Sequence, residues 1–133
     1  MKYMVMMHGN AQAFAEMATT WSPADVKAMI EFMGTVGEDL AAGGELVDAR
    51  GLATPDQVKV VHAGPDGEPV VTDGPFPEAK EVLAGYWIVD VADEARAAEI
   101  AARVSACPGP GGAPLNQPIQ LLPVLDAPEG VSD

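Results

Sequence analysis

The amino-acid sequence predicts an α+β fold in which helices cover one face of a sheet. Three observations favour this fold. Short apolar runs with strand character alternate with two amphipathic helical patterns along the 133 residues. A Gly/Pro/Asp turn between two of these runs predicts a hairpin. The first and the penultimate strands are apolar at both odd and even positions, which is typical of strands covered on both sides.

The first predicted strand covers residues 3–8. Its odd and even positions are apolar up to Met7, so the pattern does not indicate that either face of the strand is exposed to solvent. His8 falls at the end of this strand, in phase with Met4 and Met6. A histidine at a strand end is well placed either for a structural hydrogen bond or for chemistry.

A long amphipathic helix is predicted to begin after Ser22. The serine can cap it, the following proline suits the first helical position, and Asp25 completes a capping box. Apolar residues then recur at three- and four-residue spacing as far as Leu40, and the pair Gly43-Gly44 ends the helix. The preceding alanine-rich residues 11–21 predict only a helical turn, closed by a tryptophan.

The remaining elements follow in chain order. They are predicted strands at 45–52, 57–62, 69–72 and 82–91, a helix over 93–106, a Pro/Gly loop at 108–114 and a last strand at 118–125. This order resembles the split βαβ plan of ferredoxin-like folds, with an added hairpin. Two helices can cover only one face of such a sheet, so the second apolar face predicts a homodimer formed about a two-fold axis.

The chain length fits one domain, predicted over residues 1–125, followed by a flexible acidic tail over residues 126–133. The net charge of −13, from 7 basic and 20 acidic side chains, disfavours nucleic acid and anionic membranes as partners. No apolar run approaches the ~20 residues of a membrane span, and the N-terminus has no signal-peptide cleavage site. The single cysteine, Cys107, excludes an intramolecular disulfide and suits the cytoplasm.

A transition-metal site is not expected, because the two histidines and one cysteine show no ligand spacing, whereas a site built from a histidine and carboxylates stays open. No bound cofactor is expected. Cys107 has no basic neighbour closer than Arg103 to stabilise a thiolate, so it is expected to be inert.

The most unusual stretch is Asp73–Glu81, which places an acid, a glycine, two prolines, an aromatic ring and three charges between two predicted strands. Asp73 can accept hydrogen bonds from backbone amides, and Gly74 permits positive φ or close approach. Phe76 suits an anchor packed into a groove. Two interpretations stand: a rigid loop whose composition encodes geometry, or an ordered loop that places Asp73 at a pocket between sheet and helices.

His8 and Asp73 are the candidate catalytic residues. They could pair as general base and orienting acid, which is the minimum for proton transfer near neutral pH. The alternative for His8 is a histidine with purely structural hydrogen bonds. The residues expected to contact a ligand beside this pair are Met6, Gly74, Phe76, Lys80 and Glu81.

The motif also carries a family resemblance. Asp73-Gly74-Pro75-Phe76 followed by Glu78 and Lys80-Glu81, with Met1-Lys2-Tyr3-Met4 and Pro123-Val124, resembles the DGPF branch of YCII-related proteins over roughly residues 1–125. The resemblance implies a dimeric α+β barrel of ferredoxin-like subunits and a bacterial origin. It also implies a link to extracytoplasmic-function sigma factors, beside whose genes family genes often lie. It implies no established substrate, although YCII-like relatives are proposed to use a His/Asp pair and the wider superfamily includes small-molecule isomerases and monooxygenases.

Several positions depart from the family pattern. Pro77 and Ala79 stand where alanine and threonine are more usual, and His8 stands where a tyrosine is common. Leu122 stands where the last strand usually carries an arginine before a proline. If that arginine binds an anionic ligand in relatives, this chain lacks it.

Three functions remain open. The first is a cofactor-independent small-molecule enzyme, isomerase- or oxygenase-like, in which Asp73 and His8 handle protons; it comes first because dimers of this class enclose a chamber. The second is a ligand-sensing module in sigma-factor regulation. The third is a protein-interaction module that contacts a sigma factor through its acidic surface.

Overall fold

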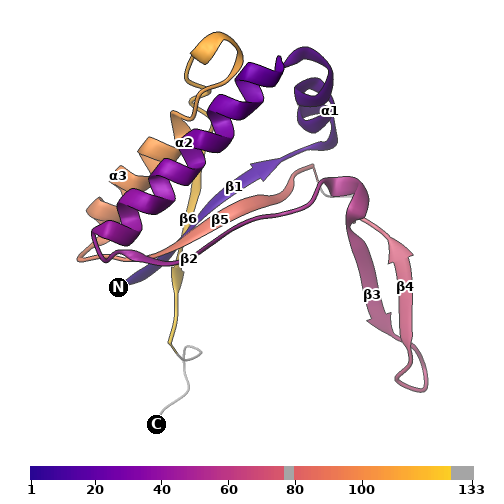
Figure 1. Cartoon of the computed structure of the whole chain (residues 1–133). Helices are drawn as coiled ribbons and strands as arrows, with labels where there is room; N and C mark the ends of the chain where they lie inside the picture. Colours follow the sequence, from indigo (N-terminus) through magenta and orange to yellow (C-terminus); the bar gives the residue numbers. More distant parts are fainter. Residues whose placement is uncertain (77–79, 127–133) are drawn as a thin grey trace.

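The computed structural model of the chain describes residues 1–76 and 80–126 (Figure 1). These residues form a four-stranded sheet, a two-stranded hairpin that projects from it, and helices that lie on one face of the sheet. In chain order the elements are β1 (Lys2–Gly9), α1 (Ala11–Thr20), α2 (Pro23–Ala42), β2 (Leu46–Gly51), β3 (Lys59–Ala63), β4 (Pro69–Asp73), β5 (Val82–Asp90), α3 (Glu94–Ser105) and β6 (Gln120–Val124), with short 3-10 turns at Pro55–Gln57 and Pro110–Gly112.

The four-stranded sheet has the order β2-β5-β1-β6, and every neighbouring pair is antiparallel. When the hairpin β3-β4 is set aside, these strands are the second, third, first and fourth of the sheet in sequence. That order is the ferredoxin-like arrangement, so the predicted α+β fold with an added hairpin is confirmed. The dimer and the barrel stay predictions.

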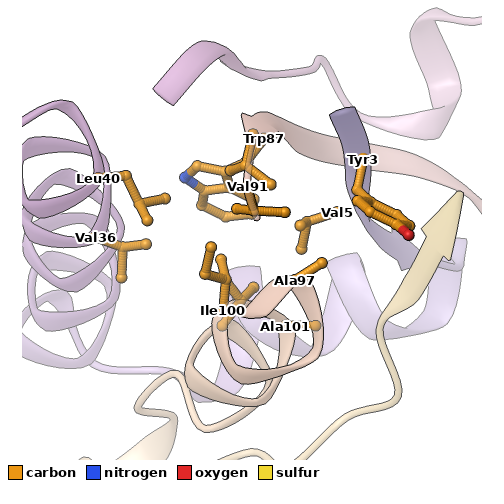
Figure 2. Close-up of a cluster of buried hydrophobic side chains, with 11 residues drawn as sticks. Tyr3, Val5, Val36, Leu40, Trp87, Val91, Ala97, Ile100 and Ala101 are labelled. Atoms are coloured by element: carbon orange, nitrogen blue, oxygen red, sulfur yellow. The ribbon is translucent and has the colours of Figure 1, made fainter. Parts of the chain in front are cut away.

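The hydrophobic core lies between the sheet and the helices α2 and α3 (Figure 2). Val5 of β1 and Val89 of β5 have no solvent exposure, and full burial of such a side chain stabilises a fold by about 1.5–3 kcal/mol. Val5 pairs in register with Trp87, which is also buried. The other core side chains are Tyr3, Val36, Leu40, Val91, Ala97, Ile100, Ala101 and Val104.

The opposite face of the sheet is apolar too, and no helix of the described residues covers it (Figure 1). Met4 pairs in register with Ile88 on one side and with Leu122 on the other, and Leu122 is 54% exposed. Met6 occupies the next position on the same face, beside Tyr86. The prediction that the first strand is apolar on both faces is therefore confirmed.

The helix starts follow local capping signals. The predicted capping box is present, because the Asp25 amide donates to Ser22 Oγ (3.1 Å) and the Ser22 amide donates to Asp25 Oδ2 (3.0 Å). The region 11–21 differs from the prediction, since α1 is a full helix and not a single turn. Its cap is Asn10, whose side-chain oxygen accepts from the Ala13 amide at 2.7 Å. None of the described helices is long and apolar enough to cross a membrane.

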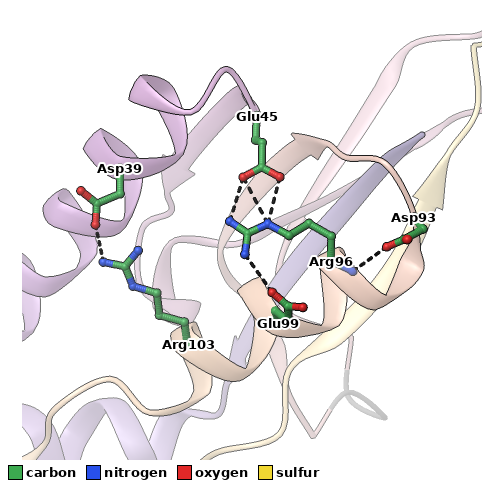
Figure 3. A network of polar contacts seen from close by, with 6 residues as sticks. All are labelled: Asp39, Glu45, Asp93, Arg96, Glu99 and Arg103. Carbon is green, nitrogen blue, oxygen red and sulfur yellow. Dashed lines mark hydrogen bonds and ion pairs between the residues drawn. The ribbon is translucent and has the colours of Figure 1, made fainter.

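Two arginines of α3 join that helix to α2 and to the segment that follows α2 (Figure 3). The Arg96 guanidinium donates to both oxygens of Glu45, with Nη2–Oε1 at 2.8 Å and Nε–Oε2 at 3.0 Å. It also reaches Glu99 at 3.1 Å. Arg103 Nη2 lies 2.6 Å from Asp39 Oδ2 on α2. The hydrogen bonds from Arg96, and then its charge, hold the pKa of Glu45 below its usual range although burial opposes this.

Removing the α2 cap should destabilise the fold. For Ser22→Ala we expect a loss of about 1 kcal/mol of unfolding free energy, because the Asp25 amide loses its acceptor. In a domain of this size that loss lowers the melting temperature by about 3–5 °C. Thr35→Ala, which removes an exposed hydroxyl from the middle of the same helix, serves as the control and should not lower it. Equal melting temperatures for Ser22→Ala and the parent in thermal denaturation would contradict the capping role.

The Glu45–Arg96 contact should make stability depend on pH. Because the folded-state pKa of Glu45 is lowered, its contribution is present above the unfolded-state value of about 4.3 and is lost as pH falls through the folded-state pKa. Glu45→Gln should therefore have a lower melting temperature than the parent at about pH 7, and this difference should be smaller at about pH 3. Glu31 forms a 3.8 Å pair with Lys27, and Glu31→Gln should have nearly the melting temperature of the parent at either pH. If the melting temperature of Glu45→Gln differs from that of the parent by the same amount at both pH values, the Glu45–Arg96 contact does not make stability depend on pH.

Candidate functional site

A cavity of about 720 Å³ lies between α1, α2 and the sheet. The end of β1 contributes residues 7–9, β2 and the residue after it contribute 49–52, and β5 contributes 84–87. The segment after α3 adds Leu115 and Gln117 to the wall. Small-molecule sites typically occupy about 300–1,000 Å³, so this cavity is large enough for a ligand of that class.

The wall of the cavity is mostly apolar and rich in methionine and aromatic side chains. Methionine adapts its shape to different apolar ligands because its chain is unbranched and polarizable. Met33 packs against the core, and Met29 and Met33 both line the cavity as well. The full set of these lining residues is Met7, Phe14, Met17, Trp21, Met29, Met33, Tyr86 and Trp87.

Two glycines inside α2 leave part of the cavity open. Gly34 and Gly37 both line it, and a Cβ atom built on either one would meet no atom within 4 Å. Close packing against a neighbour is therefore not the reason for a glycine at either position. In the interior of a helix each glycine costs about 0.5–1 kcal/mol relative to alanine.

α1 supplies another wall of the cavity and is held to the body by few contacts. Phe14 and Met17 line the cavity, yet α1 buries none of its residues. The ring of Phe14 lies against Gly9 so closely that a Cβ there would be 2.7 Å from Cε2 of the ring. A side chain at position 9 would therefore displace the Phe14 ring from its place in the cavity wall.

The charged residues along the cavity are Glu16 of α1, Glu38 of α2 and Arg50 of β2. Arg50 is already engaged, since its Nη1 lies 2.9 Å from Asp48 Oδ1 and donates to the Ala49 carbonyl at 2.7 Å. The Tyr86 hydroxyl donates to the other oxygen of Asp48 at 3.1 Å. This hydrogen bond, with partial burial, raises the pKa of Tyr86.

The two predicted catalytic residues do not meet within one chain. His8 is among the residues that line the cavity, and its role in catalysis stays a prediction. Asp73 is the last residue of β4, on the hairpin that projects from the sheet (Figure 1). It is not part of the cavity wall, and its side chain is 87% exposed. On the hairpin it forms an ion pair with Lys59 of β3, and this contact lowers the pKa of Asp73. Their pairing as base and acid stays a prediction.

The first residues of the Asp73–Glu81 stretch build the root of the hairpin. Asp73 and Lys59 are register partners across the two strands, and the Gly74 amide extends the ladder by donating to the Val58 carbonyl at 2.8 Å. A Cβ on Gly74 would lie 2.8 Å from Cγ1 of Val58, so this close approach requires glycine. The interpretation of the motif as a geometric device accounts for both residues.

The other residues predicted to contact a ligand lie in separate places in the described part of the structure. Met6 lies on the sheet face turned away from the helices, and Phe76 is 62% exposed beyond the hairpin root. Lys80 and Glu81 are exposed just before β5. None of these four lines the cavity. Pro77, Glu78 and Ala79 of the same motif, and the tail residues 127–133, lie outside the described residues.

Other features bear on chemistry at the site. Within residues 1–76 and 80–126, no three His, Cys, Asp or Glu side chains are grouped as they would be to hold a metal ion. Cys107 also lines the cavity, and burial raises the pKa of its thiol, so little thiolate forms near neutral pH. Sequence reasoning missed the contributions of α1, Gly34 and Gly37; two glycines within an amphipathic helix were the available signal.

Comparison with known proteins places the chain in a family. The family model described as the YCII-related domain matches residues 1–108, which run from β1 to just beyond α3 and include most of the cavity wall. A search of curated proteins finds no match. The match confirms the family resemblance, while the DGPF branch within it stays a prediction. The chain belongs to the YCII-related domain family.

Proposed function

We propose that this protein binds an apolar small molecule in the cavity between α1, α2 and the sheet. The observation that carries the proposal is the cavity itself, with its volume of about 720 Å³ and its wall of methionine and aromatic side chains. A cavity lined by such side chains favours an apolar ligand, because burying apolar surface is the main favourable term in binding.

The glycines of α2 support a ligand as the occupant. Gly34 and Gly37 each lower helix stability, and no neighbouring atom requires their small size. Natural proteins accept such losses where function needs the space. A ligand that lies against the backbone of α2 would use the room that these two residues leave.

Catalysis is the more specific form of the proposal. His8 lines the cavity, and an imidazole can take up or release a proton near neutral pH, as a cofactor-independent isomerase- or oxygenase-like enzyme needs. Asp73 could assist it only by leaving Lys59, or by reaching the site of a second copy from the projecting hairpin. A ligand sensor linked to a sigma factor would use the same cavity without turnover.

We also propose that the uncovered sheet face pairs with a second copy of the chain. Met4, Ile88 and Leu122 form a cross-strand row on this face, and monomers seldom leave such a surface in water. A two-fold axis would place the same row of each copy against the other.

Ligand binding can be tested with N-phenyl-1-naphthylamine, an uncharged dye that fluoresces in apolar surroundings. Both tryptophans of the chain, Trp21 and Trp87, line the cavity, so bound dye should quench their emission by energy transfer. Gly34→Leu should fill part of the cavity and weaken dye binding by about tenfold or more. The same substitution should raise the melting temperature, because leucine is the better helix former.

Thr35→Leu is the matched control, since Thr35 is exposed on α2 and does not line the cavity. It should leave dye binding unchanged. If the dye binds saturably but Gly34→Leu and Thr35→Leu change its affinity equally, the dye binds elsewhere on the protein and the proposal fails. The proposal also fails if the parent binds no dye.

The dimer can be tested by light scattering coupled to gel filtration. The parent should elute with twice the chain mass of 13.8 kDa, and Leu122→Glu should elute as a monomer because it places a charge in the paired face. Ile30→Glu alters a similarly exposed residue on α2 and should stay dimeric. A parent that is monomeric at all concentrations, or a dimer that Leu122→Glu leaves intact, would rule out this interface.

A further inference from the structure

The charges along the cavity indicate which ligands it accepts; this inference rests on the proposed function, that the cavity holds an apolar small molecule. Among the described residues, its lining holds two carboxylates, Glu16 and Glu38, and a single guanidinium, Arg50. None of the four lysines lines it. An anionic ligand is normally held by arginine, lysine or a cluster of backbone amides.

The guanidinium of Arg50 is not available to a ligand anion. It is paired with Asp48 at 2.9 Å and donates to the Ala49 carbonyl, and Asp48 also accepts the Tyr86 hydroxyl. By their register, Arg50, Tyr86 and Met6 lie on one face of the sheet, the face turned away from the helices, where Asp48 contacts both Arg50 and Tyr86. The guanidinium charge is therefore directed away from the helix-facing side of the sheet and is already balanced by a carboxylate.

We propose that the cavity selects apolar amines over apolar acids: its ligand carries a positively charged nitrogen, and carboxylates and phosphates are disfavoured. The apolar part of such a ligand would lie among the methionines and against Gly34 and Gly37, with the ammonium group directed to Glu16 or Glu38. Phe14 and Trp21 add aromatic rings to the same wall, and ring faces attract cations.

The ratio of the affinities for an amine and an acid is limited because the two carboxylates are exposed to water. Glu16 and Glu38 are both exposed, so each attracts a cation and repels an anion only modestly. Because both carboxylates attract an amine and repel an acid, we expect an amine to bind about ten times more tightly than an acid of the same shape at low salt. High salt should reduce this ratio.

Three naphthalene compounds that differ in one substituent test the inference: 1-naphthylmethylamine, 1-naphthylmethanol and 1-naphthoic acid, used near pH 7. Each is titrated against bound N-phenyl-1-naphthylamine, and displacement gives its affinity. We expect the amine to displace the dye at about one tenth of the concentration that the acid requires, with the alcohol between them.

Two double variants distinguish charges at the cavity from the charge of the whole chain. Glu16→Gln with Glu38→Gln should remove most of the difference between amine and acid while the affinity of the alcohol stays the same. Glu31→Gln with Asp66→Asn removes two exposed carboxylates that do not line the cavity and should keep the difference.

The outcomes separate this inference from the proposed function. If the alcohol displaces the dye but the acid binds as well as the amine, the cavity binds apolar ligands without this selectivity and the inference is overturned. A preference for the amine that survives in the Glu16/Glu38 double variant overturns it as well. If the parent binds neither the dye nor the alcohol, the proposed function itself fails.

Discussion

The packing of β1 and β5 beneath α2 and α3 is the interaction on which the rest of the structure depends. Val5 and Val89 lose all their exposure there, and the register of β1 with β5 and β6 then assigns every other residue of the sheet to a face. With Val5 turned towards the helices, Met4 and Met6 must face the other way. The uncovered apolar face is thus a direct consequence of how the core is built.

Helix α2 serves two purposes along its length. Its C-terminal part carries Val36 and Leu40 into the core, and the ion pair of Asp39 with Arg103 joins it to α3 (Figures 2 and 3). Gly34 and Gly37 lie on a different side of the helix, where they give up side chains and border the cavity instead. The core and the cavity thus meet different sides of α2, so changes that enlarge or reduce the cavity need not disturb the core.

Features set by neighbouring residues were predictable from sequence, and features set by distant ones were not. The capping box of Ser22 and Asp25 is a signal within four residues, and the alternation in β1 needs only eight. The cavity is assembled from β1, α1, α2, β2 and β5, so no single stretch reveals it. The role of Asp73 depends on the hairpin register, which puts Lys59 opposite it, and turn chemistry alone left both interpretations of the motif open.

The way the hairpin joins the sheet has a consequence for how this protein can change. The chain leaves the sheet after Leu52 and returns at β5, where the Leu52 amide donates to the Ala84 carbonyl at 2.9 Å. The two ends of the excursion are therefore already side by side, and a short connection could replace everything between them at little entropic cost. The length and surface of the hairpin can therefore change freely during evolution, because the four strands of the ferredoxin-like sheet pair with one another without it.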